Sequence, residues 1–256
     1  MKFKNLSISI LLLIAMGAMT QAQNRELNHW VSFKTQYLQI KDAYNYGLTH
    51  RGLNLAGAYS LTATSDKSTF SYDAEIGFGA NYNQGLGLSW SFKPFDLFYG
   101  FRLNNNPDLV LTLGPYLSGY YKWQLYPELQ SGHMLWFSSY EIGPEIWASI
   151  PLESRLLSIS IASSLFSLNS RPQDSPETYF YSLTLNDFVS NVHSDMNLGS
   201  LNAFQHFDVQ VALSGQNKRF RIGYEFEYLG YSNDPKYQYI IHSINLIWQV
   251  GNKNKN

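Results

Sequence analysis

The stretch Thr69–Tyr82, TFSYDAEIGFGANY, decides the fold. Every second residue belongs to an apolar or aromatic set: Phe70, Tyr72, Ala74, Ile76, Phe78, Ala80 and Tyr82. The residues between them are polar, acidic or glycine: Ser71, Asp73, Glu75, Gly77, Gly79 and Asn81. Side chains alternate between two faces only in a strand, so this strand meets two different environments. It is longer than the roughly 5–6 residues of a typical soluble strand, and about 9–11 tilted residues cross a bilayer. The stretch therefore predicts one strand of a transmembrane β-barrel, with its apolar face toward lipid and its polar face toward the lumen.

The first residues have the pattern of a secretory signal peptide. Lys2 and Lys4 provide a positive segment, residues 8–16 are apolar, and Thr20-Gln21-Ala22 fits a small-x-small cleavage site. A membrane anchor is the alternative, but the apolar run is shorter than the about 20 residues that a spanning helix needs. We therefore expect residues 1–22 to be removed and residues 23–256 to form one barrel domain.

The composition fits a lipid-facing barrel. Aromatic residues make up 16% of the chain and charged residues only 14%, against about 25% charged residues in a typical soluble protein. There is no cysteine, so the fold closes without disulfides. The net charge of −1 and the scattered basic residues give no support for nucleic-acid binding.

The same alternation recurs in nine further segments. These are Trp30–Lys41, Arg51–Ala63, Gly85–Leu103, Asp108–Trp123, Leu135–Ile150, Leu156–Ser167, Phe204–Ser214, Arg219–Tyr231 and Tyr237–Val250. With the opening stretch they predict an antiparallel, up-and-down, all-β barrel of ten strands, an even number as in single-chain bacterial barrels. With the N-terminus periplasmic, the connections 64–68, 104–107, 151–154 and 215–218 face the periplasm and are all short, and the longest connection, 168–203, falls on the outer side. Residues 177–185 also alternate, and twelve strands result if they and a partner are embedded.

A bulge at Pro94 is expected to reverse the alternation within Gly85–Leu103. Before Pro94, Trp90 and Phe92 face outward, and continuing that parity would place Asp96 and Arg102 in lipid. One extra residue at the proline turns both charges inward. Two separate strands broken at Pro94 are the alternative.

With these ten alternating segments, the chain resembles the small outer-membrane β-barrel proteins of Gram-negative bacteria. The resemblance covers Trp30–Val250 and includes the aromatic-rich last segment, Tyr237–Val250, which looks like the terminal assembly signal of that class. Six polar residues follow Val250, whereas the commonest form of that signal ends on an aromatic residue. The resemblance implies residence in the outer membrane, contact with its lipid, and handling by periplasmic chaperones and the barrel-assembly machinery. The class includes pores, adhesins, proteases and lipid-modifying enzymes, so it implies no particular activity.

The inward faces of the predicted strands carry both acidic and basic side chains. They are Lys34, Asp73, Glu75, Lys93, Asp96, Arg102, Lys122, Glu141, Glu145, His206, Asp208, Arg221, Glu225 and Glu227. The lumen of a small barrel is narrow, and buried charges need partners, so we expect these groups to pair into a structural network that fills it. A narrow polar pathway for a small solute is the alternative.

Catalytic candidates are weak. His206 and Asp208 share one face of a predicted strand and could form a histidine–carboxylate pair, with Ser164 on the preceding strand. His193-Ser194-Asp195 lies in the long outer connection, and His242 and Ser243 are adjacent and so point to opposite faces. The His–Ser spacing of outer-membrane lipases is absent, and no cofactor or metal motif is present.

The connection 168–203 is the strongest candidate for a contact surface. Loops carry specificity on rigid barrels, and Tyr179, Phe180, Tyr181 and Phe188 would suit an extracellular protein or glycan ligand. A lid folded over the barrel mouth is the alternative. The sequence thus predicts a non-catalytic outer-membrane barrel with a charge-filled lumen. The other possibilities are a porin-like narrow channel or a hydrolase that uses His206 and Asp208.

Overall fold

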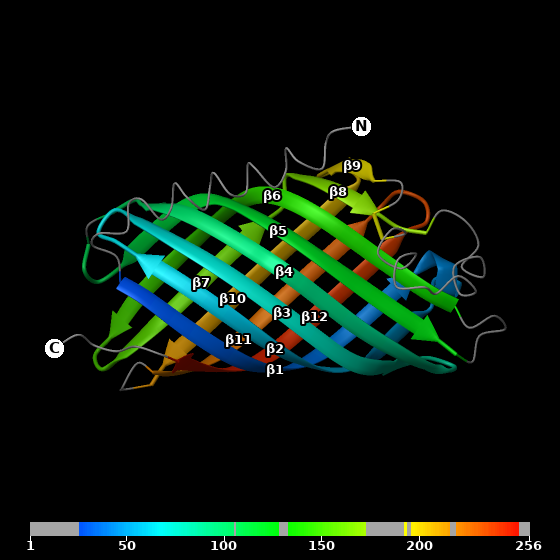
Figure 1. Cartoon of the computed structure of the whole chain (residues 1–256), viewed down its shortest axis with the longest axis horizontal. Coiled ribbons are helices and arrows are strands. Elements are labelled where there is room, and N and C mark those ends of the chain that lie inside the picture. Colours follow the sequence, from blue (N-terminus) through cyan, green and yellow to red (C-terminus); the bar gives the residue numbers. More distant parts are fainter. Residues whose placement is uncertain are drawn as a thin grey trace.

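The computed structural model describes residues 26–104, 106–127, 133–172, 192–193, 196–215 and 219–250. Ten long antiparallel strands close into one barrel, and two short strands lie beside it (Figure 1). The barrel strands are β1 (Glu26–Asp42), β2 (Thr49–Thr64), β3 (Ser68–Tyr82), β4 (Leu86–Arg102), β5 (Val110–Tyr126), β6 (His133–Leu152), β7 (Arg155–Ser163), β10 (Phe204–Ser214), β11 (Phe220–Tyr231) and β12 (Tyr237–Val250). The prediction of ten barrel strands is therefore confirmed.

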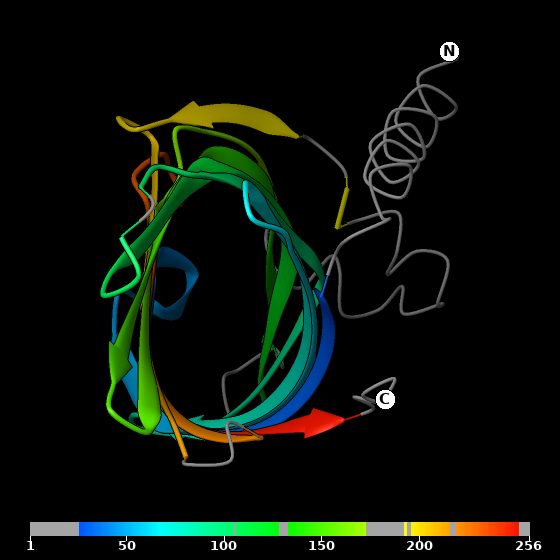
Figure 2. The same ribbon diagram turned by 90° about the vertical axis from the view of Figure 1, so that its left-hand side faces the viewer.

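The barrel is closed along its whole wall. Neighbouring strands pair in order around the ring, β5 pairs with β6, and the first and last strands meet along His29–Asp42 of β1. Seen from the end, the strands form a ring (Figure 2). A closed barrel leaves no unpaired backbone edge, which is what a strand-built membrane protein requires.

The outward faces of the strands form an apolar band. Ile76 of β3 is 66% exposed, whereas its neighbour Gly77 is buried. The same alternation gives exposed Leu53, Phe101 and Ile244 on other strands. A closed barrel with an apolar outside and a charged lumen is the architecture of outer-membrane barrels, and this chain is an integral outer-membrane β-barrel protein. No helix among the described residues is long and apolar enough to cross a membrane.

The bulge predicted at Pro94 is present in β4. The register shifts by one residue between Asp73 and Glu75 on the β3 side, and between Phe92 and Phe95 on the β5 side. Phe101 consequently remains exposed while Arg102 turns inward. The alternative of two strands broken at the proline is wrong, because β4 pairs with its neighbours on both sides of the shift.

The two ends of the barrel differ. The start of β1 and the end of β12 lie at one end of the barrel, where β2 meets β3, β4 meets β5, β6 meets β7 and β10 meets β11. The longest connection, between β7 and β10, begins at the opposite end, which identifies the first end as periplasmic. At the other end, a 3-10 turn η2 (Ala43–Asn45) follows β1. There, a hairpin of β8 (Phe166–Ser170) and β9 (Asn197–Ser200) lies beside the outer part of β6, with β8 paired to Ser138–Ile142 (Figure 1).

This hairpin corrects the seventh predicted strand. The segment predicted as one strand, Leu156–Ser167, is interrupted at Ser164 and Leu165. β7 and β8 both pair with β6, but on the other side β7 pairs with β10 whereas β8 pairs with β9. The long connection between the barrel strands therefore begins as ordered strand rather than as loop. The predicted alternation at 177–185 and the predicted signal peptide at 1–22 lie outside the described residues.

Candidate functional site

The lumen holds the charged side chains, and the first group of them centres on Lys34 of β1. Its Nζ lies 2.6 Å from Glu75 Oε2 of β3 and 2.6 Å from Glu225 Oε2 of β11. Gln36 donates to the other oxygen of Glu75 at 3.1 Å, and Asn245 donates to Glu225 at 3.2 Å. One cation thus joins two carboxylates from strands that lie two positions away on either side of β1.

The second group centres on Glu227 of β11. Lys122 of β5 lies 2.6 Å from Glu227 Oε1 and sits over the ring of Tyr239, 3.9 Å from its centre. His206 Nε2 is 3.5 Å from the same oxygen, and His206 Nδ1 hydrogen-bonds Glu141. Both histidine nitrogens therefore face carboxylates, which fixes the imidazole in place.

The bulge at Pro94 adds a third pair. Lys93 Nζ lies 3.5 Å from Asp96 Oδ2, although residues three apart on a regular strand point to opposite faces. The extra residue brings both side chains into the lumen. Below them, Trp147 donates its indole N–H to Glu145.

An apolar layer fills the lumen toward the outer end. Its buried residues come from six strands: Leu38, Ile40, Tyr120, Phe137, Phe204, Leu229, Tyr231, Tyr237, Tyr239 and Ile241. Phe137 stacks on both Phe204 and Tyr237, with ring centres 6.1 and 5.1 Å apart. The side chains of this layer are almost fully buried against one another, as in a protein core.

Arg171 lies at the outer end of the barrel and contacts Tyr237 of this layer. Its guanidinium reaches from the end of β8 to Asp42 of β1, at 2.8 and 2.9 Å from the two carboxylate oxygens. It also donates to the carbonyl of Pro235 at 3.0 Å and lies over Tyr237. With 1% of its side chain exposed, Arg171 connects three segments at the outer end.

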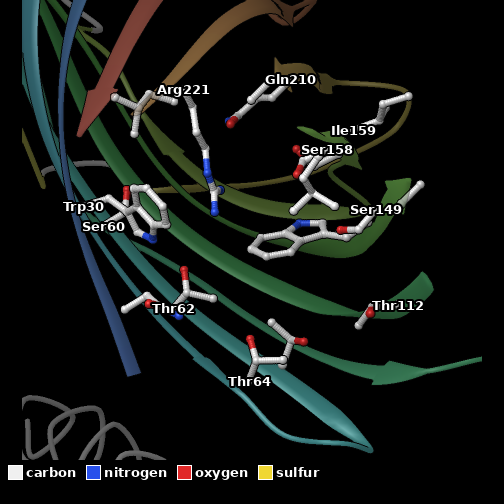
Figure 3. A pocket seen from close by; sticks show the side chains of 18 of the residues that line it. Trp30, Ser60, Thr62, Thr64, Thr112, Ser149, Ser158, Ile159, Gln210 and Arg221 are labelled. Carbon is white, nitrogen blue, oxygen red and sulfur yellow. The ribbon is translucent and has the colours of Figure 1, made fainter. Parts of the chain in front are cut away.

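The periplasmic half of the lumen is hollow. A cavity of about 310 Å³ lies between Trp30 and Trp147, and a second of about 100 Å³ continues above it past Asp73. The walls carry many hydroxyl groups: Ser60, Thr62, Thr64, Thr69, Thr112, Ser149, Ser158 and Ser160 (Figure 3). Arg221 extends into this space beside Trp30 (Figure 3), with its guanidinium carbon 3.8 Å from the indole centre.

Several sequence predictions for the lumen need correction. Arg102 joins no ion pair among the described residues and donates to the carbonyl of Asn104, because it lies at the periplasmic turn beyond the reach of the carboxylates. Arg221 stacks on Trp30 instead of pairing with an acid. Asp208 is buried but joins neither an ion pair nor a cavity wall within the described residues. The other predicted members are brought together as pairs or line the cavities, Asp73 among the latter.

The predicted His206–Asp208 pair does not form. The two share a face of β10, but the imidazole binds Glu141 and Glu227, which approach from β6 and β11. Ser164 accepts the backbone N–H of His206 at 2.9 Å and does not contact the ring. Within the described chain, no group of three or more His, Asp and Glu side chains is arranged to hold a metal ion.

His193 and His242 lie outside the lumen, whereas His50 is buried on the inward face of β2 beside Tyr126. His193 hydrogen-bonds the hydroxyls of Tyr121 and Tyr140 at 2.8 and 2.9 Å on the outward face. His242 bonds Tyr224 outward at 2.7 Å, while Ser243 is buried inside. The predicted contact residues Tyr179, Phe180, Tyr181 and Phe188 lie outside the described residues, as do Ser194 and Asp195.

The sequence reasoning missed the apolar layer, although the signal was there. The inward-facing residues of a strand change from charged to apolar toward its outer end. In β1, for example, Lys34 is followed on the same face by Leu38 and Ile40. The cavity at the other end follows from small hydroxyl residues at the same parity, such as Thr62 and Thr112.

No protein-family model matches the chain, and no curated protein matches it significantly. Solved structures with a similar arrangement include the outer-membrane protease OmpT from Escherichia coli, at 9% identity and a TM-score of 0.42, covering 90% of this chain and 97% of that one. The β domain of the Bordetella autotransporter BrkA matches at 10% identity and 0.41, covering 88% and 99%. The translocator domain of the autotransporter NalP from Neisseria meningitidis matches at 8% and 0.38, covering 96% and 98%. These identities and TM-scores are too low to indicate a function, so the function is inferred from the lumen.

Proposed function

We propose that this outer-membrane barrel is non-conducting and non-catalytic, with a lumen sealed toward the cell exterior. The observation that supports this most is the apolar layer over the two buried ion-pair groups, with Arg171 and Asp42 paired at the outer end of the barrel. An ion crossing this layer would lose its hydration shell and gain no polar partner in exchange, which is prohibitively costly.

A narrow channel is the competing function. It would need a continuous polar path, whereas the hydroxyl-lined cavities lie in the periplasmic part and the apolar layer lies beyond them. A hydrolase is disfavoured, because a general base must reach a nucleophile or water in contact with substrate. His206 is buried between Glu141 and Glu227.

On this proposal the protein acts through its outer surface. Loops of rigid barrels carry specificity, and the long outer connection holds the aromatic residues Tyr179, Phe180, Tyr181 and Phe188. We propose an extracellular protein or glycan as the ligand of this loop, and periplasmic chaperones and the barrel-assembly machinery as transient partners during biogenesis.

Single-channel recording in planar lipid bilayers tests the seal. We expect no conductance steps from the wild-type barrel. A variant that removes three of the rings, Tyr120→Ala, Phe137→Ala and Tyr239→Ala, should open the outer half and show steps. The same variant verifies that the protein inserts in the assay. Regular steps from the wild-type protein would overturn the proposal in favour of a channel.

A further inference from the structure

The side chain of Arg221 has no acidic partner within the described chain. Lys34 and Lys122 each contact a carboxylate at 2.6 Å, and Lys93 contacts one at 3.5 Å. The Nε–H of Arg221 is buried and donates to no hydrogen-bond partner among the described residues, and its guanidinium rests on Trp30. Placing a cation in the lumen without a counterion costs free energy, so binding of an external anion at Arg221 would be favourable.

The surroundings hold the guanidinium ready for such an anion. Trp30 covers one face of the planar group, which keeps its N–H edge directed along the cavity. A guanidinium presents several donors in a fixed fork that matches a carboxylate or phosphate. Gln210 and Ser158 line the cavity wall opposite Trp30 (Figure 3).

The rest of the cavity defines the body of the ligand. Hydroxyl groups both donate and accept hydrogen bonds, so a wall of Ser and Thr suits a body that is itself rich in hydroxyls. The volume of about 310 Å³ lies at the lower end of the range for small-molecule sites. Asp73 borders both cavities, and Glu145 borders the second one deeper in the lumen. These carboxylates would repel an anion, so the anionic group is placed at Arg221.

From these features we infer that the periplasmic half of the lumen is a binding site for a small hydroxylated anion, such as a sugar acid or a sugar phosphate. The anionic group binds Arg221, and the hydroxylated body lies against the Ser and Thr wall. The ligand enters from the periplasm, since all the lining strand ends lie at that side. The site does not require the barrel to conduct or to be sealed.

Isothermal titration calorimetry on the full barrel tests the site. The protein is refolded in a polyoxyethylene detergent, whose head group has neither charge nor sugar. Glucuronate and glucose 6-phosphate are compared with glucose, which has the same body without the anionic group. We expect each anion to bind at least about ten-fold more tightly than glucose, as a charge-assisted hydrogen bond implies.

Arg221→Gln should reduce binding of both anions to the level of glucose. Arg155→Gln is the matched control, because Arg155 is exposed at a periplasmic turn outside the cavity, and should leave binding unchanged. Binding of glucuronate but not of glucose 6-phosphate would identify the ligand as a carboxylate. Binding of glucose 6-phosphate but not of glucuronate would identify it as a phosphate. Either result supports an anion site. Equal binding of glucose and the anions, or unchanged binding in Arg221→Gln, would overturn it.

A chemical readout covers the case in which Arg221→Gln does not refold. Phenylglyoxal modifies accessible arginines, and mass spectrometry of wild-type protein measures modification at each position. Glucuronate should protect Arg221 and not Arg155. Equal modification of Arg221 with and without glucuronate and glucose 6-phosphate would overturn the site.

Discussion

The outer and periplasmic halves of the lumen are built from the same strands and yet have opposite character. Along the inward face of β1, Trp30 borders the cavity, Lys34 joins the ion pairs, and Leu38 and Ile40 belong to the apolar layer. One alternating strand thus runs from a hollow vestibule through a charged middle to a packed core. The comparison teaches that the wall of a barrel fixes only which residues face inward. What the interior becomes is decided by the size and polarity of those residues at each height.

The largest effect is expected at the charged middle. Lys34→Ala removes the cation between Glu75 and Glu225 and leaves two buried carboxylates facing each other. We expect a loss of about 3–5 kcal/mol in the free energy of unfolding, as for other broken buried ion pairs. Urea titration in lipid vesicles, followed by tryptophan fluorescence, measures it.

Two variants identify the cause of that loss. Lys67→Ala removes an exposed lysine at a periplasmic turn and should leave stability unchanged. Adding Glu75→Gln and Glu225→Gln to Lys34→Ala removes the uncompensated charges and should recover most of the loss. A triple variant as unstable as Lys34→Ala would mean that packing, and not charge, dominates here.

The next effect compares the two halves directly. Leu38 is fully buried in the apolar layer, so Leu38→Ala should cost about 2–5 kcal/mol. Thr62 faces the periplasmic cavity, where its methyl group has open space beside it, and Thr62→Ala should change stability by less than about 0.5 kcal/mol. The same urea titration gives both values, and similar losses would show that the periplasmic half is packed as tightly as the outer one.

The smallest effect concerns glycines on the two sides of the wall. A Cβ at Gly79 would lie 1.9 Å from Asn54 Oδ1 and 2.2 Å from the Leu53 carbonyl oxygen, so Gly79→Ala should cost about 1–3 kcal/mol. Gly57 faces outward with nothing within 4 Å of the added atom, and Gly57→Ala should stay within about 0.5 kcal/mol. A cost at Gly57 equal to that at Gly79 would contradict the assignment of inside and outside.

The sequence could predict the wall but only part of its contents. Alternation alone gave the faces of Thr69–Tyr82, and the conflict at Asp96 and Arg102 revealed the bulge at Pro94, because lipid does not accept charges. The partners of His206 could not be predicted, since Glu141 and Glu227 arrive from strands whose relative heights depend on register around the whole ring. The β8–β9 hairpin was missed for a similar reason: the alternation continues from β7 into β8, while the pairing partner changes from β10 to β9.

The pairing of β1 with β12 has a consequence for how the protein is made. The two strands of that seam are the first and the last along the chain. Until the final residues have been synthesised and delivered, the growing sheet has two edge strands with unpaired backbone N–H and C=O groups. These edges could form β-pairing with any neighbouring chain. Insertion is therefore an all-at-once event that waits for the carboxyl-terminal segment, and a truncation that removes only β12 should yield aggregate rather than a nine-stranded barrel.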